Sequence, residues 1–466
     1  MSMLRVVNPA TGTVVRDLPC DTPASVDGKV AAAREALPAW RERSLGERVA
    51  IIRRFRDMLV ERADQLALVL TTETGKPISQ ARGEIRATPG RLDFFLENVE
   101  TVIAPKLMRR EPMGSGVPGT GALEETVTYE PLGVVANISA WNYPYFVGSN
   151  VFAPALLAGN AVVYKPSEHA TLTGLAIAGL LHEAGVPEAI FTTAVGRGDV
   201  GAALIDAGVD GVFFTGSYST GVKVATSAAH HLIPTQLELG GKDPVYVADD
   251  VDPAAVASAL ADGAFYNNGQ SCCAVERIYV HRSVFMAFRT AFVEAINGFS
   301  MGDPAKTDTY LGPLTREEQL AVLQAQVDDA VSKGATVLAG GRRADREGWY
   351  FEPTILSNVT HDMKVMREET FGPVIGIQEV SDDQEAAKLM ADTPYGLTAG
   401  VYSADRARAA AVLAQLPTGS SYWNCCDRVS PVLPWTGRGH SGLGSTLSHE
   451  GIRAFVTPRA WHMRAP

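Results

Sequence analysis

The first hundred residues have the hydrophobic periodicity of amphipathic helices. In Leu45–Gly75, apolar residues recur every three or four positions, and arginine and glutamate occupy much of the opposite face. The segments Ser25–Arg41 and Ile78–Val99 repeat this pattern. We therefore predict packed helices with a structural role in all three segments.

From Gly133 onwards, short apolar runs alternate with helical patterns. The predicted strands are Val134–Ile138, Ala161–Lys165, Ile190–Thr192 and Gly211–Phe214, and the predicted helices are Asn150–Leu157, Leu172–Ala184, Val200–Ala207 and Ser219–His230. Strands that alternate with helices predict a parallel, doubly wound sheet. Such sheets bind ligands at the carboxyl ends of their strands.

A second α/β lobe is predicted between about Gly241 and Gly437. Val275–Val280 has the composition of a strand, and Val284–Ile296 and Glu317–Lys333 have helical periodicity. The fold class predicted overall is α/β, with a Rossmann-like cofactor domain, a second α/β domain and a small β hairpin.

Residues 111–130 interrupt the first lobe. The run Gly114–Gly119 matches Gly-x-Gly-x-x-Gly, but no strand precedes it, no helix follows it and Pro118 lies inside it, so we reject it as a dinucleotide loop. Thr126–Glu130 alternates as a strand does. We predict a protruding hairpin.

Composition narrows the class of protein. The chain has 466 residues, enough for two or three lobes, and its net charge of −11 argues against nucleic acid or an anionic membrane as a partner. Five cysteines without metal-like spacing indicate neither a disulfide framework nor a metal site, so a reducing cytoplasm is expected. The N-terminus has no signal-peptide pattern, and the apolar runs are too short for a bilayer.

Candidate chemistry is concentrated between Gln236 and Arg277. Glu238 and Cys272 flank a predicted helix from Asp252 to Gly263, which can return the chain so that both side chains face one cavity. A thiolate can attack a carbonyl carbon, and a carboxylate can activate water to release the product. The alternative is an exposed charge and a buried, inert cysteine.

The segments around these two residues resemble signatures of the aldehyde dehydrogenase superfamily. Leu237-Glu238-Leu239-Gly240-Gly241-Lys242 is similar to the motif of the catalytic glutamate, and Phe265–Ala274 is similar to the motif of the nucleophile. The resemblance covers nearly the whole chain. It implies that Cys272, and not Cys273, is the nucleophile and that Glu238 is the base of an NAD(P)-dependent, non-acylating aldehyde dehydrogenase.

The same resemblance assigns an oxyanion donor. Ala140-Trp141-Asn142-Tyr143-Pro144 is similar to a family motif that begins with proline, and Asn142 is implied as the donor beside the Cys272 amide. A structural turn before Pro144 is the alternative.

Two predicted strand ends carry groups that suit a dinucleotide, although capping and turn chemistry explain them equally well. The resemblance implies contacts of Lys165 and Glu168 with the adenosine ribose, a pyrophosphate turn at Gly216 and Ser217, and NAD as cofactor, with NADP possible. The complete set of implied cofactor residues is Trp141, Lys165, Glu168, Phe214, Gly216, Ser217, Glu369 and Phe371. Glu369 is expected at the nicotinamide ribose and Phe371 near the ring.

The aldehyde channel is expected to be aromatic. By the resemblance, Tyr143, Tyr145, Trp423 and Trp435 flank it. This lining suits an aromatic or medium-length apolar aldehyde, or a quaternary ammonium one. If Arg428 points inward, a semialdehyde with a carboxylate becomes the better hypothesis; the alternative is that Arg428 is a solvated loop charge.

The C-terminal segment departs most from the family pattern, because Ser445-Thr446 replaces the usual Arg-Glu. We expect this change to affect the loop and subunit contacts rather than the chemistry. The predicted domains are residues 1–110 with 131–239 for the dinucleotide, 240–437 for catalysis, and 111–130 with 452–466 as an oligomerisation arm. The tail is expected to add an edge strand to a partner in a homodimer or homotetramer.

Three other functions compete with oxidation of a small-molecule aldehyde to its acid. A CoA-acylating relative typically lacks the glutamate that Glu238 supplies. A phosphorylating dehydrogenase needs a histidine beside its cysteine, and the first one downstream is His281. A catalytically silent structural protein on the same fold remains the third alternative.

Overall fold

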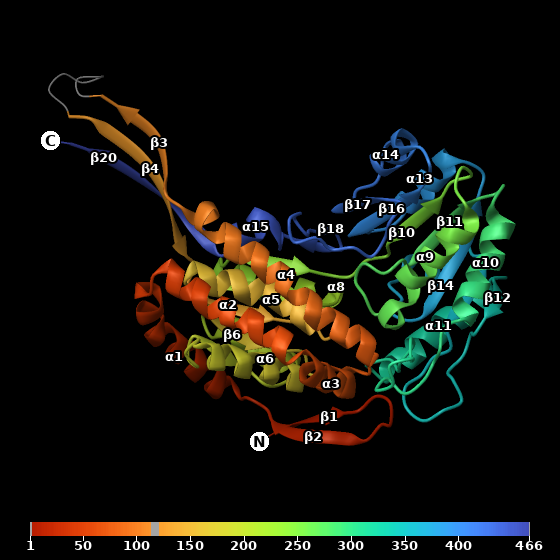
Figure 1. The fold of residues 1–466 in the computed structure, drawn as a ribbon, viewed down its shortest axis with the longest axis horizontal. Helices are drawn as coiled ribbons and strands as arrows, with labels where there is room; N and C mark the ends of the chain where they lie inside the picture. The colour runs from red at the N-terminus through yellow and green to blue at the C-terminus, as the bar shows by residue number, and fades with distance from the viewer. Residues whose placement is uncertain (1, 113–120, 466) are drawn as a thin grey trace.

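The computed structural model describes residues 2–112 and 121–465. Figure 1 shows two lobes side by side and a β arm that projects away from the first lobe. The arm contains the C-terminal strand, whereas the N-terminal hairpin, β1 (Met3–Val7) with β2 (Val14–Pro19), lies along the first lobe.

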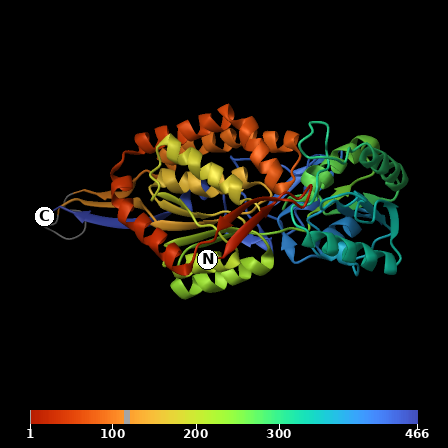
Figure 2. The same ribbon diagram turned by 90° about the horizontal axis from the view of Figure 1, so that it is seen from below.

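The first lobe contains a six-stranded sheet in the order β19-β9-β8-β5-β6-β7. Its strands are β5 (Val134–Ile138), β6 (Ala161–Lys165), β7 (Phe191–Thr193), β8 (Gly211–Thr215), β9 (Thr235–Glu238) and β19 (Gly442–Leu443). All neighbours are parallel except β19 and β9. The connecting helices are α5 (Pro144–Ala158), α6 (Thr171–Ala184), α7 (Gly198–Asp206) and α8 (Tyr218–His231). Figure 2 shows helices on both faces, so the predicted doubly wound sheet is confirmed.

The N-terminal helices pack against this lobe. They are α1 (Pro23–Glu42), α2 (Leu45–Glu61), α3 (Ala63–Thr74) and α4 (Ile78–Ile103). The prediction of one helix over Leu45–Gly75 was wrong, because the chain breaks at Arg62, whose φ of −106° and ψ of 15° end the helix. α3 then ends at Gly75 with a φ of +76°, a left-handed conformation that glycine adopts at low cost.

The second lobe contains a seven-stranded sheet in the order β12-β13-β14-β11-β10-β16-β17. Its strands are β10 (Pro244–Val247), β11 (Arg277–His281), β12 (Thr336–Ala339), β13 (Thr354–Ser357), β14 (Val374–Val380), β16 (Thr398–Tyr402) and β17 (Ser420–Trp423). Its helices are α9 (Pro253–Phe265), α10 (Phe285–Asn297), α11 (Glu318–Ser332), α12 (Lys364–Arg367), α13 (Asp383–Ala391) and α14 (Arg406–Leu413). Among the described strands of this sheet, β12 and β13 pair antiparallel and the other neighbours pair parallel.

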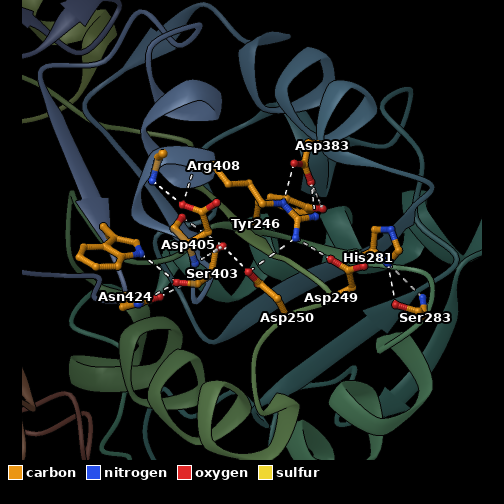
Figure 3. A network of polar contacts seen from close by, with 12 residues as sticks. Tyr246, Asp249, Asp250, His281, Ser283, Asp383, Ser403, Asp405, Arg408 and Asn424 are labelled. Atoms are coloured by element: carbon orange, nitrogen blue, oxygen red, sulfur yellow. Dashed lines mark hydrogen bonds and ion pairs between the residues drawn. The ribbon is translucent and has the colours of Figure 1, made fainter.

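A polar network stabilises the carboxyl ends of the strands in this second sheet (Figure 3). Arg408 from α14 contacts Asp383 and Asp249, each at 2.6 Å, and Asp250 at 3.7 Å. Ser403, which follows β16, donates to Asp250 at 2.8 Å. One guanidinium thus links three carboxylates at one end of the sheet. The loop before β11, which carries the predicted nucleophile, lies at the other end.

The arm is a three-stranded antiparallel sheet in the order β20-β4-β3. Its strands are β3 (Lys106–Glu111), β4 (Leu123–Pro131) and β20 (Val456–Arg464), and Gly114–Gly119 falls outside the described residues. The C-terminal tail pairs with β4 of its own chain from Val456 to Arg464 and forms one edge of the arm, so its addition to a partner's sheet stays a prediction. Ile452, predicted to belong to the arm, lies in α15 (Ser448–Arg453) and is fully buried in the body of the protein.

No helix in the described ranges is long and apolar enough to cross a membrane.

Two very short strands, β15 (Tyr395–Gly396) and β18 (Arg438–Gly439), pair with each other near the C-terminal loop. Most buried apolar side chains lie around the two sheets and their covering helices. At the junction of the lobes, the segment after β5 contacts the loop before β11 through Asn142 and Gln270, and the segment after β9 contacts the loop before β14 through Gly241 and Glu369.

Candidate active site

A cavity of about 480 Å³ lies at this junction, and we call it the aldehyde cavity. Glu238, the last residue of β9, and Cys272, in the loop before β11, both line it. The two residues come from different lobes, and the structure brings them to the same space, as the sequence predicted. Residues of α4, the start of α5 and the segment 427–435 complete the wall.

The backbone before Cys272 has an unusual conformation. Asn267, Asn268 and Gly269 have φ angles of +53°, +57° and +67°, and asparagine and glycine are the residues that tolerate this left-handed region best. The Asn268 amide donates to the carbonyls of Gly312 at 2.7 Å and Pro313 at 2.9 Å. This anchored turn fixes the loop that presents Cys272 to the cavity.

The vicinal cysteines differ in environment. Cys272 is partly exposed, whereas Cys273 is buried and its Sγ donates to Asp427 Oδ1 at 3.0 Å. A hydrogen bond with Cys272, followed by burial, holds the pKa of the Cys273 thiol well above its usual value. Cys273 is therefore kept as a protonated donor, and Cys272 is the better candidate for a nucleophile.

Glu238 is held by the C-terminal segment. Gly442 of β19 pairs with Glu238, and the Thr446 hydroxyl donates to Glu238 Oε1. Gln236 Nε2 is a weaker donor to the same oxygen, at 3.4 Å. Burial raises the pKa of the Glu238 carboxyl, which makes its carboxylate a stronger base than a solvated one.

The contact with Thr446 corrects an expectation. We predicted that Ser445-Thr446 would affect only loop conformation and subunit contacts, but Thr446 touches the candidate base directly. The main chain of Thr446 also forms a reciprocal bridge with Trp435, at 2.8 and 2.9 Å. Because Trp435 lines the aldehyde cavity, this bridge links the cavity wall to Glu238.

Asn142 follows β5 and is 5% exposed. Its Nδ2 donates to the Gln270 carbonyl at 3.2 Å, and its own carbonyl accepts from Asn267 Nδ2 at 3.4 Å. The structure therefore places Asn142 against the loop that carries Cys272. An amide nitrogen carries two hydrogens, so the second is left to donate elsewhere.

A second cavity of about 410 Å³ lies at the carboxyl ends of β5, β6 and β8, and we call it the cofactor cavity. It is lined by six of the eight predicted cofactor residues: Trp141, Lys165, Glu168, Phe214, Gly216 and Ser217. Ser217 caps α8, whose first turn points amide groups at the cavity. Ile205 and Val224 form an apolar wall. A carboxylate, a helix N-terminus and an apolar wall together fit the ribose, phosphate and base of a dinucleotide.

Lys165 and Glu168 form an ion pair at 3.7 Å in this cavity. Burial alone would raise the pKa of Glu168, but the Lys165 ammonium, a backbone hydrogen bond and further cations together outweigh burial, so that the pKa lies below its usual value. Glu168 is therefore ionised at neutral pH.

The other two predicted cofactor residues lie outside the cofactor cavity. The Phe371 ring packs edge-on against Trp141, with centroids 5.4 Å apart, and Glu369 Oε1 accepts from the Gly241 amide at 3.1 Å. A side chain at Gly240 would collide with the Glu369 carboxylate. Burial raises the pKa of Glu369 to about 8. Both residues thus lie between the cofactor cavity and the segment that carries Glu238.

A buried ion pair positions the segment that carries Glu369 and Phe371. Lys242 Nζ lies 2.5 Å from Glu276 Oε2, and the two side chains are 0% and 5% exposed. Glu276 accepts from the amides of Thr370 at 2.9 Å and Phe371 at 3.0 Å. This pair ties the loop before β14 to β11.

The predicted substrate residues have different positions in the structure. Tyr143 and Trp435 line the aldehyde cavity, and so does the exposed Arg428. Tyr145 is 1% exposed and packs in the hydrophobic core, because it follows Pro144 in the first turn of α5 and points inward. Trp423 instead donates to the Ser403 carbonyl at the far end of the second sheet.

Sequence reasoning missed the contribution of α4. Its cavity face carries Gly83, Glu84, Ala87, Gly90 and Arg91, although we predicted only a packed structural helix. The one signal in the sequence was that the small residues Gly83, Ala87 and Gly90 recur at helical spacing next to the charged residues Glu84 and Arg91.

Comparison with known proteins gives the family. The aldehyde dehydrogenase family model matches residues 2–460. The chain is 37% identical to a succinate-semialdehyde dehydrogenase [NADP(+)] of Deinococcus radiodurans over 97% of this chain and 93% of that protein. It is 36% identical to aminoaldehyde dehydrogenase 2, peroxisomal, of Pisum sativum, over 97% and 90%.

Solved structures agree with this match. PnpE in complex with nicotinamide adenine dinucleotide superposes with a TM-score of 0.94 at 32% identity, covering 99% of this chain and 94% of that one. Lactaldehyde dehydrogenase from Escherichia coli superposes with a TM-score of 0.93 at 31% identity, covering 99% and 96%. The fold, the two cavities and these matches lead to one conclusion: the chain belongs to the aldehyde dehydrogenase family.

Proposed function

We propose that the chain oxidises an aldehyde to its carboxylic acid with NAD(P), with Cys272 as nucleophile and Glu238 as base. The observation that carries the proposal is that both side chains line one cavity although they come from different lobes. Family membership supports the overall reaction, and the geometry supports the roles of the residues.

In the first half-reaction, the Cys272 sulfur, as the thiolate, forms a bond to the aldehyde carbon, and the carbonyl π electrons move to oxygen. The second hydrogen of Asn142 Nδ2 and the Cys272 backbone amide stabilise this oxyanion. The cofactor cavity would hold NAD(P), which would supply the hydride acceptor for oxidation of this adduct to a thioester on Cys272. The cofactor cavity and the Trp141–Phe371 pair support this use of a dinucleotide.

In the second half-reaction, Glu238 accepts a proton from water as the water oxygen attacks the thioester carbon. The C–S bond breaks, and the acid leaves. The raised pKa of Glu238 suits this role, because a carboxylate with a higher pKa holds the proton of water more strongly. A glutamate in this cavity favours hydrolysis over transfer to CoA. None of the described residues that line the cavity is a histidine, the residue that a phosphorylating enzyme needs beside its cysteine.

Glu168 supports a preference for NAD over NADP. The ionised carboxylate lines the cofactor cavity, where it would accept hydrogen bonds from ribose hydroxyls and repel a 2′-phosphate.

The arm supports assembly into a homodimer or homotetramer. β20 and β3 are the two edge strands of a sheet that projects from the body, and such edges pair readily with another chain.

Five free cysteines are consistent with a reducing cytoplasm.

The proposal is tested by NADH absorbance with a panel of aldehydes, with and without CoA or phosphate. We expect turnover that needs neither addition and is lost in Cys272→Ala. Dependence on CoA or phosphate, or full activity in Cys272→Ala, would overturn it.

The names of the two relatives specify one acidic and one amino-bearing aldehyde, so family membership leaves the charge of the substrate open.

A further inference from the structure

The aldehyde cavity has an unusual wall along α4. Three of its residues there, Gly83, Ala87 and Gly90, have little or no side chain. A Cβ added at Gly90 would meet nothing within 4 Å, and one at Gly83 would meet only the Tyr266 hydroxyl, at 3.5 Å. This face therefore leaves open space in front of the next residue along it, Arg91.

Arg91 is a buried cation that lines the cavity and forms no ion pair with the described part of the chain. It is 7% exposed, its Nη1 donates to Asn150 Oδ1 at 3.2 Å, and its guanidinium lies 3.9 Å from the centre of the Phe146 ring. Among residues 2–112 and 121–465, no carboxylate oxygen lies within 4.0 Å of it. Burial lowers the pKa of Arg91 only to about 10, so it is charged at neutral pH. A buried charge without a partner is costly, which indicates that a ligand supplies the partner.

Of the three acidic residues in the wall, Glu238 is the candidate base, and the other two, Glu84 and Asp427, are engaged elsewhere. Glu84 is paired with the buried Lys76 at 2.5 Å and accepts from the Tyr145 amide at 2.9 Å. Asp427 accepts from Cys273 Sγ at 3.0 Å. Burial raises the pKa of Asp427 to about 7, so a large fraction of it is neutral near that pH. Neither side chain cancels the charge of Arg91.

The aromatic lining does not favour a cationic substrate. The Phe146 face is covered by Arg91, and the Tyr143 face is covered by Lys76 at 3.7 Å. The two rings stack on each other with centroids 5.8 Å apart. The cation–π positions that an ammonium group would occupy on these rings are therefore filled by the protein's own cations, which would also repel it.

We propose that the aldehyde cavity selects aldehydes that carry a carboxylate, with Arg91 as the residue that binds this group. A planar guanidinium can offer two parallel N–H donors to one carboxylate. Arg428 lies at the exposed rim of the same cavity and adds a second positive charge at its entrance. This specificity rests on the proposed function, because it concerns the substrate of the Cys272 reaction.

Arg91 has one competing role. Its charge also acts on Glu238 and lowers the pKa that burial has raised. If Arg91 serves only to adjust this base, its removal will slow the oxidation of every aldehyde equally and will move the pH profile. If Arg91 binds substrate, the loss will depend on the substrate's carboxylate.

The first experiment measures kcat/KM for short ω-oxo acids and for neutral aldehydes of matched length, and takes their ratio. In Arg91→Gln we expect this ratio to fall by at least about 30-fold, the lower end for the loss of one partner of a buried charge pair. Arg91→Lys keeps the charge but not the paired donors and should recover part of the ratio. Arg86→Gln is the matched control, because Arg86 lies on the same helix, is 63% exposed and contacts Asp64 instead.

The second experiment does not depend on turnover. Calorimetry should detect binding of a short dicarboxylate, the product of such an oxidation, to the wild-type protein and to Arg86→Gln, with at least about 30-fold weaker binding to Arg91→Gln. Any of three results would overturn the proposal. They are an unchanged kcat/KM ratio in Arg91→Gln, a preference of the wild-type protein for neutral or cationic aldehydes, and equal dicarboxylate binding by all variants. Absence of turnover with every aldehyde would refute the proposed function, and dicarboxylate binding would then still decide on Arg91.

Discussion

Replacing Thr446 with valine tests whether the C-terminal segment acts on the chemistry. Valine has nearly the shape of threonine but cannot donate the hydrogen bond to Glu238. The bridge between Thr446 and Trp435 uses main-chain atoms only, so it should survive the change. Thr446→Val therefore removes one interaction of the candidate base and leaves the loop in place.

The size and direction of the effect follow from the charge on Glu238. The hydroxyl stabilises the carboxylate, so its loss should raise further a pKa that burial already raises. A hydrogen bond to a charged group contributes about 1.5–3 kcal/mol, and a pKa unit equals about 1.36 kcal/mol, so the expected rise is about 1–2 units. Because the base must be ionised, hydrolysis of the thioester weakens as pH falls through this pKa.

The assay is the pH dependence of thioester hydrolysis, measured as the steady rate that follows the first turnover of NADH. In Thr446→Val the acidic limb should lie about 1–2 units higher than in wild type, at an unchanged rate of the first turnover. Thr446→Ser keeps the hydroxyl and should keep the wild-type limb. Superimposable limbs in the valine and serine variants would refute the reasoning, and so would an equal shift in the first turnover.

Three other predictions concern the oxyanion, the cofactor and the fold. Asn142→Ala should lower kcat by about 10²–10³-fold with little change in KM, and a change in KM alone would contradict its role as oxyanion donor. Glu168→Ala should raise kcat/KM for NADP relative to NAD, and equal wild-type activity with both cofactors would show that Glu168 does not discriminate. Lys242→Met leaves Glu276 buried without its cation and should therefore lower the free energy of unfolding by about 3–5 kcal/mol, as measured by denaturant titration. A change below about 1 kcal/mol would contradict the structural role of the ion pair.

Much of the fold was predictable because local pattern and tertiary position agree. The fully buried strands Val134–Ile138 and Ala161–Lys165 have the same bounds in the sequence prediction and in the structure, since each is a mostly apolar run of strand length. Glu238 and Cys272 were predictable from the motifs around them. The break at Arg62 was not predictable, because the apolar spacing continues through it.

The errors at the site have a common physical cause. Thr446 lies 208 positions from Glu238 in the chain, and only the pairing of β19 with β9 brings them together. Tyr145 has the aromatic side chain expected of a channel residue, but the direction of this side chain is set by the turn at Pro144. Arg91 sits on a helix whose pattern is dominated by its buried face. Composition along the chain does not show which side of a packed helix faces a cavity.

The central claim is that Cys272 and Glu238 act in successive half-reactions. Its most direct test is the intact mass of Glu238→Gln after mixing with aldehyde and NAD, together with the NADH released. We predict one equivalent of NADH, then a near stop, with the acyl group retained on Cys272; Cys272→Ala should give no NADH and no added mass. Sustained wild-type turnover with an unmodified mass in Glu238→Gln would contradict the account, as would an acyl group that persists in Cys272→Ser and maps to Cys273.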